Sequence, residues 1–131
     1  MDIRKEFATS KTKEQEGIWS DFGDGLKVKI ARSGNPEYQK LFQKLAKPYQ
    51  KAIRRGNLNN EIAEKLLVEA MAKAIVLGWE GLYEGKKEIK FSEKEALRIL
   101  TEYKDLRDQI NEIAGDMESY KAESDEEAEK N

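Results

Sequence analysis

Six basic side chains recur at helical spacing between positions 36 and 55, and they are the residues best suited to bind an anionic partner. At about 100° per residue they fall within one sector of a helix. They are Lys40, Lys44, Lys47, Lys51, Arg54 and Arg55. There are three interpretations of such a face: it binds nucleic-acid phosphates, it docks another protein, or it only faces water. In the second interpretation, the chain's own acidic end would compete with the partner for the basic face. Because no aromatic residue shares this face and no nucleic-acid motif is present, we favour the solvated face, followed by protein docking.

Three further groups of residues resemble chemical sites, but each is explained better by structure. Residues 23–25 ("GDG") predict a turn rather than a phosphate loop, because no helix N-terminus follows them. The carboxylates of Asp105, Asp108 and Asp116 are too scattered to form a metal site without histidine. Trp79 stands at the expected end of a helix, which favours a core aromatic over a surface anchor for a partner.

The composition argues against an enzyme. The 131 residues include no histidine and no cysteine, so the commonest general base, the commonest metal ligand and any thiolate are absent. We therefore expect no catalytic residue, no cofactor and no metal. The 24 Lys and Arg nearly balance the 26 Asp and Glu, and the last ten residues hold five of these acids and one base. The remaining body is close to neutral, unlike that of a general nucleic-acid-binding protein.

The N-terminal quarter of the chain predicts a flexible arm followed by a β-hairpin. Residues 1–16 are polar and contain few large apolar side chains. Residues 17–32 contain two runs of strand-forming residues around a Gly-rich turn, and residues 26–30 alternate apolar and basic. An isolated hairpin is marginal in water, so it must pack on helices or pair with another strand. The segment 87–91 ("KEIKF") is a candidate third strand.

A first helix is predicted over residues 36–55. Asn35 is a favoured N-cap, Pro36 suits the first helical position, and Gly56 provides the C-terminal stop. Pro48 interrupts this helix, but the apolar side chains keep their phase on both sides of it. We therefore expect a kinked, continuous helix.

Three more helices complete the expected mainly α-helical α+β fold of a single globular domain, residues 17–120. A largely apolar helix at 60–77 is the expected centre of the core. A Ser-x-x-Glu capping box opens a helix at 93–103, and another helix follows at 104–120. Residues 121–131 are expected to form a disordered acidic tail. With no signal peptide and no apolar run of about 20 residues, we expect a soluble cytosolic protein.

Several short motifs occur in a fixed order along the chain. They read "IWSDFGDGLKVKIARSGNPEYQKLFQKLAKPYQ", "LGWEGL", "GKKEIKFSEKEALRIL" and "DLRDQINEIAGDMESYKAE", followed by an acidic end. This series resembles tail assembly chaperones of long-tailed bacteriophages, over the region from about Gly17 to the C-terminus. The resemblance implies a largely helical, non-enzymatic protein of the host cell cytoplasm that is absent from the mature virion.

In that family, the partner is the tape measure protein, which the chaperone keeps soluble while it helps to recruit the major tail (tube) protein. Some members self-associate, so homo-oligomers are also expected. Many members have a minor extended form made by programmed frameshifting, and the extension is associated with recruiting the tube subunit. Glu129-Lys130-Asn131 is compatible with a slippery heptamer (A AAA AAC or A AAA AAT), and we hypothesise slippage there.

The expected client contacts combine apolar residues near helix ends and the kink with bases that steer an acidic client. The candidate partner-binding residues are Tyr38, Pro48, Tyr49, Trp79, Lys44, Lys47 and Lys51. The main alternative is a small phage-encoded regulator that binds nucleic acid through the basic face of helix 36–55. A structural adaptor retained in the virion is a third possibility.

Overall fold

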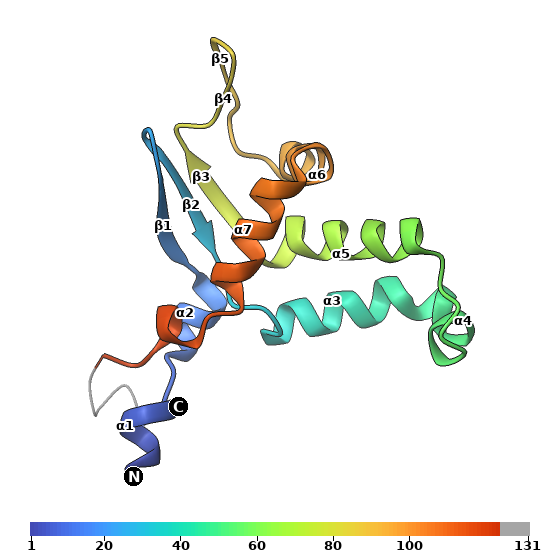
Figure 1. Cartoon of the computed structure of the whole chain (residues 1–131), viewed down its shortest axis with the longest axis horizontal. Coiled ribbons are helices and arrows are strands. Elements are labelled where there is room, and N and C mark those ends of the chain that lie inside the picture. The colour runs from blue at the N-terminus through green and yellow to red at the C-terminus, as the bar shows by residue number, and fades with distance from the viewer. Residues whose placement is uncertain (124–131) are drawn as a thin grey trace.

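In the computed structural model, which describes residues 1–123, a small antiparallel sheet packs its inner face against helices (Figure 1). Within this range the sheet has three strands in the order β1–β2–β3. The strands are β1 (Ile18–Gly23), β2 (Leu26–Ile30) and β3 (Val76–Glu80). The predicted mixed α+β class, mainly helical with an N-terminal hairpin, is confirmed.

The β1–β2 hairpin forms where the alternating pattern predicts it. Val28 and Ile30 of β2 are 2% and 0% exposed, while the intervening lysines lie on the opposite face of the sheet. Asp24 occupies the turn with φ 52°, a left-handed conformation that Asp tolerates better than most residues. The period-two pattern therefore orients this hairpin toward the core.

The third strand is not the segment that the sequence predicted. β3 follows the central helix directly and pairs with β2, placing Val28 opposite Trp79 and Lys27 opposite Glu80. Lys87–Glu88 (β5) instead pairs with Tyr83–Glu84 (β4) in a separate two-stranded hairpin. The reason is burial: Val76 and Trp79 are 1% and 8% exposed, whereas both residues of β5 are exposed.

The helices largely follow their predicted caps, although their ends differ by several residues. The Asn35 and Ser92 side chains accept hydrogen bonds from the backbone N–H of Tyr38 and Glu95. The predicted helix 104–120 ends as an α-helix at Ala114 and is followed by a 3₁₀ turn. The helical elements are α1 (Ile3–Phe7), α2 (Lys11–Glu16), α3 (Pro36–Ala46), η1 (Lys47–Tyr49), α4 (Gln50–Arg54), α5 (Asn60–Ala74), α6 (Glu93–Glu102), α7 (Lys104–Ala114) and η2 (Met117–Tyr120).

Helix α5 is the centre of the core, as its composition predicted. Val68, Met71 and Ala72 are at most 3% exposed and join one apolar cluster with side chains of the sheet, α6 and α7. The predicted helix at 60–77 ends earlier, at Ala74, because the chain turns there into β3. The core therefore lies between the sheet and these three helices.

The segment at Pro48 is bent more strongly than expected. Proline lacks the N–H that would bond the carbonyl of Lys44, and a 3₁₀ turn replaces the α-helix at Lys47–Tyr49. Tyr49 leaves the helical region at φ −111° and ψ 12°, and α4 turns away from the axis of α3 (Figure 1). The predicted apolar phase is lost beyond this turn, since Ile53 is 43% exposed.

Residues 1–16, expected as a flexible arm, contain α1 and α2, and their second half is attached to the body. The backbone N–H of Ser10 donates to the carbonyl of Tyr120 (2.8 Å), and Ala122 donates to Ala8 (3.1 Å). Tyr120 is fully buried, and its hydroxyl donates to the carbonyl of Ile30 (3.0 Å). Residues 8–10 and 120–122 therefore lie side by side, and most of the predicted acidic tail lies outside the described residues.

Candidate partner-binding surfaces

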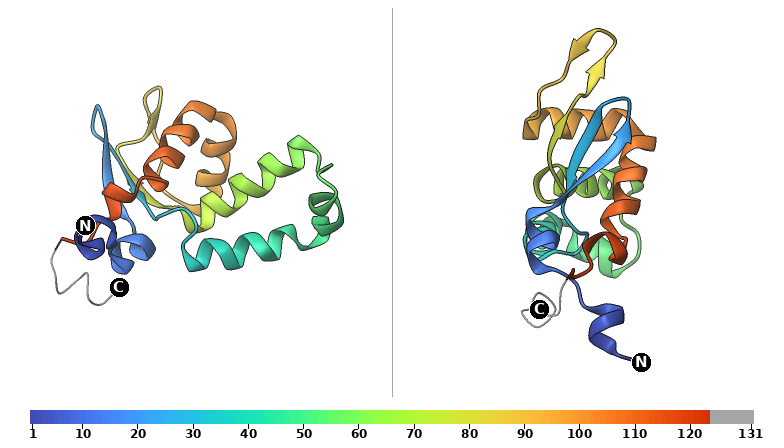
Figure 2. Two further views of the ribbon diagram at one scale, coloured as in Figure 1. Left: turned by 60° about the horizontal axis from the view of Figure 1, so that its bottom comes forward. Right: turned by 90° about the vertical axis from the view of Figure 1, so that its left-hand side faces the viewer.

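Helices α3 and α5 lie side by side; α3 and the N-terminal half of α5 project from the rest of the molecule, with α4 at the far end (Figures 1 and 2). We call residues 36–74, which contain these three helices, the helical hairpin. Its base adjoins the sheet, where the Asn35 side chain donates to the carbonyl of Ala74 (3.1 Å). This buried hydrogen bond ties the start of α3 to the end of α5, so the two helices leave the body together.

The large apolar side chains of α3 are incompletely covered. Tyr38 and Phe42 stack with ring centroids 6.0 Å apart, and burial raises the pKa of Tyr38. These side chains pack against α5, but each keeps part of its surface in solvent. The half-buried members of this strip are Tyr38, Leu41, Phe42, Leu45 and Tyr49. Partly covered apolar side chains on a projecting element are candidate contacts for another protein.

The six predicted bases all lie on the helical hairpin, but the bend at Pro48 divides them between α3, η1 and the region of α4. All six bases are exposed, and none forms an ion pair within residues 1–123. Lys44, Lys47 and Lys51 therefore have their charges open to solvent, on the same helical segments as the apolar strip. Pro48 is exposed between them.

Trp79 is a core residue and not a surface anchor. Its indole N–H donates to the carbonyl of Ile89 (2.7 Å), and its ring meets Phe91 edge-to-face at a centroid distance of 4.9 Å. With 8% of its surface exposed, it packs against Ile89 and Phe91 in the segment between β5 and α6. Of the seven candidate residues, the other six lie on the helical hairpin, and Trp79 belongs to the body.

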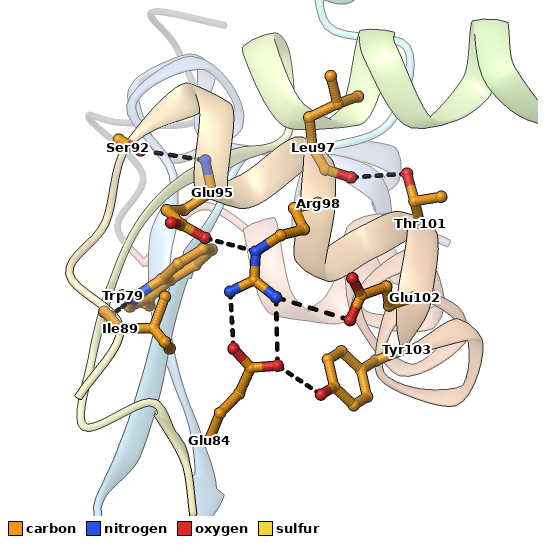
Figure 3. Close-up of polar contacts among 10 residues, drawn as sticks. All are labelled: Trp79, Glu84, Ile89, Ser92, Glu95, Leu97, Arg98, Thr101, Glu102 and Tyr103. Atoms are coloured by element: carbon orange, nitrogen blue, oxygen red, sulfur yellow. Dashed lines mark hydrogen bonds and ion pairs between the residues drawn. The ribbon is translucent and has the colours of Figure 1, made fainter. Parts of the chain in front are cut away.

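Sequence reasoning missed a polar cluster around Arg98, which ties the β4–β5 hairpin to α6 (Figure 3). Arg98 donates two hydrogen bonds to Glu84 (2.7 and 3.2 Å) and one to Glu95 (2.8 Å). The Tyr103 hydroxyl donates to the same Glu84 carboxylate (2.6 Å). Glu84 and Arg98 stand 14 positions apart on different elements, and no spacing rule signals such a pair.

These contacts fix the charge state of Glu84. The hydrogen bonds from Arg98, followed by that from Tyr103, lower the pKa of Glu84 from 4.5 to about 2. The pKa of Tyr103 is raised in return, mainly by its hydrogen bond to Glu84. A hairpin whose strands have only two residues each is marginally stable by itself. The contacts around Arg98 therefore explain how the β4–β5 hairpin is held against α6.

A partly apolar groove of about 480 Å³ lies between α5, α6 and the start of α7. Leu97 is 39% exposed beside it, and we call it the Leu97 groove. In this groove the Glu64 carboxylate forms ion pairs with Arg107 (3.0 Å) and Lys104 (3.5 Å). These contacts lower the pKa of Glu64, and the hydrogen bond from Arg107 is the largest cause. The lining residues are Glu61, Glu64, Lys65, Val68, Glu69, Leu97, Thr101 and Lys104.

The described part of the chain offers neither a metal site nor a membrane span. Among residues 1–123, no group of three or more His, Cys, Asp or Glu side chains is arranged to hold a metal ion. In the same residues, no helix has the length and apolar character needed to span a bilayer. The "GDG" segment forms the β1–β2 turn.

Comparison with known proteins gives one family. A family model described as "YdaY prophage protein" matches residues 33–131, which is more than half of the chain. The match includes the whole helical hairpin and begins just after the β1–β2 hairpin. No curated protein and no solved structure matched the chain.

Proposed function

Because the chain belongs to the YdaY prophage protein family, and is therefore phage-derived, we propose that it acts as a non-enzymatic tail assembly chaperone. In this role it binds the tape measure protein, keeps it soluble and helps to recruit tail tube subunits. It works in the host cell cytoplasm and is absent from the mature virion. Mass spectrometry of purified particles tests the last point, since a structural adaptor would remain in them.

The observation that carries the proposal is the half-buried apolar strip on α3. A tape measure protein offers long amphipathic helical segments, which bind by laying their apolar faces on a complementary surface. Leu41, Phe42 and Leu45 supply such a surface on a projecting helix. The neighbouring lysines favour client segments that carry acidic residues.

Co-expression with the tape measure protein of the same prophage tests the proposal. The wild-type chain is expected to raise the soluble fraction of the tape measure protein. Tyr49→Ser, together with charge reversal of Lys44 and Lys47, should reduce this effect, because it removes apolar area and steering charge. Tyr83→Ser is the matched control, since Tyr83 is an exposed tyrosine (55%) on the β4–β5 hairpin. No solubilisation by the wild-type chain contradicts the proposal.

The six exposed bases, which form no ion pair with other described residues, favour one alternative, a nucleic-acid-binding regulator. Phosphate contacts make binding strongly dependent on salt, so a titration of DNA and RNA binding against ionic strength separates the two functions. Binding that is retained at low ionic strength and lost on adding salt would favour the regulator. Absence of DNA and RNA binding even at low ionic strength would exclude the regulator.

A further inference from the structure

Strand β1 has one edge along which no other described element runs. It is the outermost strand of its sheet and pairs with β2. In an antiparallel strand the backbone N–H and C=O groups point alternately to the two sides, so about half of those in β1 point away from β2. Apart from this ladder, no backbone hydrogen bond joins β1 to another described residue. In Figure 1 β1 is the outermost described element on its side, and the right-hand view of Figure 2 looks onto this edge.

Most of this edge lacks the features that protect sheet edges from pairing with another chain. Such features are charged side chains, proline, bulges and very short strands. The register of β1 is regular over residues 18–21, and its irregularity lies between Asp21 and Gly23, next to the turn. In the regular part Asp21 is the one charged residue, and the others are Ile18, Trp19 and Ser20. The regular part can therefore accept a further strand.

The largest side chain on the outer face of β1 leaves this edge open. A Cβ added to Gly78 would lie 3.7 Å from Cη2 of Trp19 and 3.9 Å from Cβ of Lys29. Gly78 stands on β3, two strands away from Trp19, so the indole extends over β2 and away from the free edge. An added strand would therefore not need to displace this ring.

We propose that β1 binds an extended segment of another protein, which adds to the sheet as a fourth strand. Exposed sheet edges bind peptides in this way, with backbone hydrogen bonds supplying affinity and alternate side chains supplying specificity. The segment that fits has apolar residues at every second position and basic residues between them. On the inner face Ile18 and Phe22 are half-buried, so apolar side chains beside them would complete their cover.

The charges on the outer face select the basic residues of the partner. One row across the sheet consists of Asp21, Lys27 and Glu80, which alternate in sign. A base beside Asp21 on the added strand continues this alternation. Strand β2 follows the same rule on the other side of β1, since its sequence LKVKI places Lys27 opposite Asp21 and Lys29 opposite Trp19. A second copy of β1 fits poorly, because this strand contains an acid and no base.

This inference is independent of the proposed chaperone function. It concerns the sheet and an extended partner, whereas the proposed client binds α3 as a helix. Strand β1 also lies outside residues 33–131, the part of the chain that matches the family model.

An NMR titration of the isotope-labelled full-length chain tests this contact. The probe is a capped pentapeptide with the β2 sequence, Leu-Lys-Val-Lys-Ile, added to millimolar concentration so that weak binding is detected. The amide signals of residues 18–21 should shift, and those of α3 should not. The matched control, Leu-Glu-Val-Glu-Ile, should bind about fivefold more weakly, because it places an acid beside Asp21.

Methylation of the peptide backbone distinguishes strand pairing from simple charge attraction. Methylating one alternate set of amides in the lysine peptide should abolish the shifts, because those N–H groups point at β1, whereas methylating the other set should leave them unchanged. Equal effects of the two methylated peptides, or no shift of residues 18–21 with the unmodified one, overturn the proposal. Shifts of the same amides on raising the protein concentration alone would show a second copy at this edge and overturn the choice of partner.

Discussion

At the scale of single residues, Glu84 is the described carboxylate whose pKa is lowered most strongly, and hydrogen bonds rather than burial are the cause. Arg98 holds its carboxylate by two hydrogen bonds, and Tyr103 adds a third. The carboxylate joins β4 to α6, so its protonation state affects the attachment of the whole β4–β5 hairpin. The stability of this attachment therefore depends on pH, whereas the backbone hydrogen bonds between β4 and β5 alone would give no such dependence.

The first prediction is the pH window of that attachment. The pKa of Glu84 is lowered from 4.5 to about 2 in the folded chain, so its contribution to stability is present above pH 4.5 and is lost as the pH falls toward 2. A carboxyl-detected NMR titration should show a midpoint near 2 for Glu84. Tyr103→Phe should raise that midpoint, because it removes one hydrogen bond to the charged form. A wild-type midpoint at the ordinary glutamate value would contradict the assignment.

The second prediction compares the two tryptophans. Trp79→Ala should lower the free energy of unfolding by about 3–5 kcal/mol, since it empties a core site and leaves the carbonyl of Ile89 without its donor. Trp19→Ala, at a position 51% exposed, should cost much less. Urea unfolding followed by circular dichroism measures both variants. Equal losses would mean that Trp79 is not the core residue described above.

At the scale of elements, the caps and the alternating strand were predictable because their signals are local. Asn35, Ser92 and the period-two run of β2 each depend on residues within a few positions. Strand β3 was missed because the apolar run from α5 into Val76 continues without a polar break, and short apolar runs do not distinguish helix from strand. The cluster around Arg98 was missed because it joins elements that only the fold brings together.

The third prediction concerns the contact between the β1–β2 turn and the end of β3. Gly81 has φ +75°, and a Cβ there would overlap the carbonyl oxygen of Gly25 and lie 2.9 Å from its carbon. Gly81→Ala should therefore destabilise the chain by well over the ~1–2 kcal/mol of left-handed strain. Gly85→Ala is the matched control, because its φ is +61° with nothing within 4 Å of the new Cβ. Similar unfolding midpoints for the two variants would refute the close contact.

At the scale of the whole molecule, the chain combines a well-packed body with a less covered projection. β2, the end of α5 and α6 share one apolar cluster, and Tyr120 joins the segment around Ser10 to β2. On α3 the large apolar side chains are half-buried, and Ala46 is the buried member of that helix. Local opening free energies follow such differences in burial, so the two parts should differ in dynamics.

The last prediction follows from this contrast. Backbone amides of α3 should exchange with solvent faster than those of β2, because α3 opens without disrupting the central cluster. Hydrogen exchange followed by mass spectrometry measures this. A tape measure segment bound to the apolar strip should slow exchange in α3 and leave β2 unchanged. Protection of α3 equal to that of β2 in the free chain would show that the projecting helix is as stable as the body, and would remove the physical reason for a docking strip there.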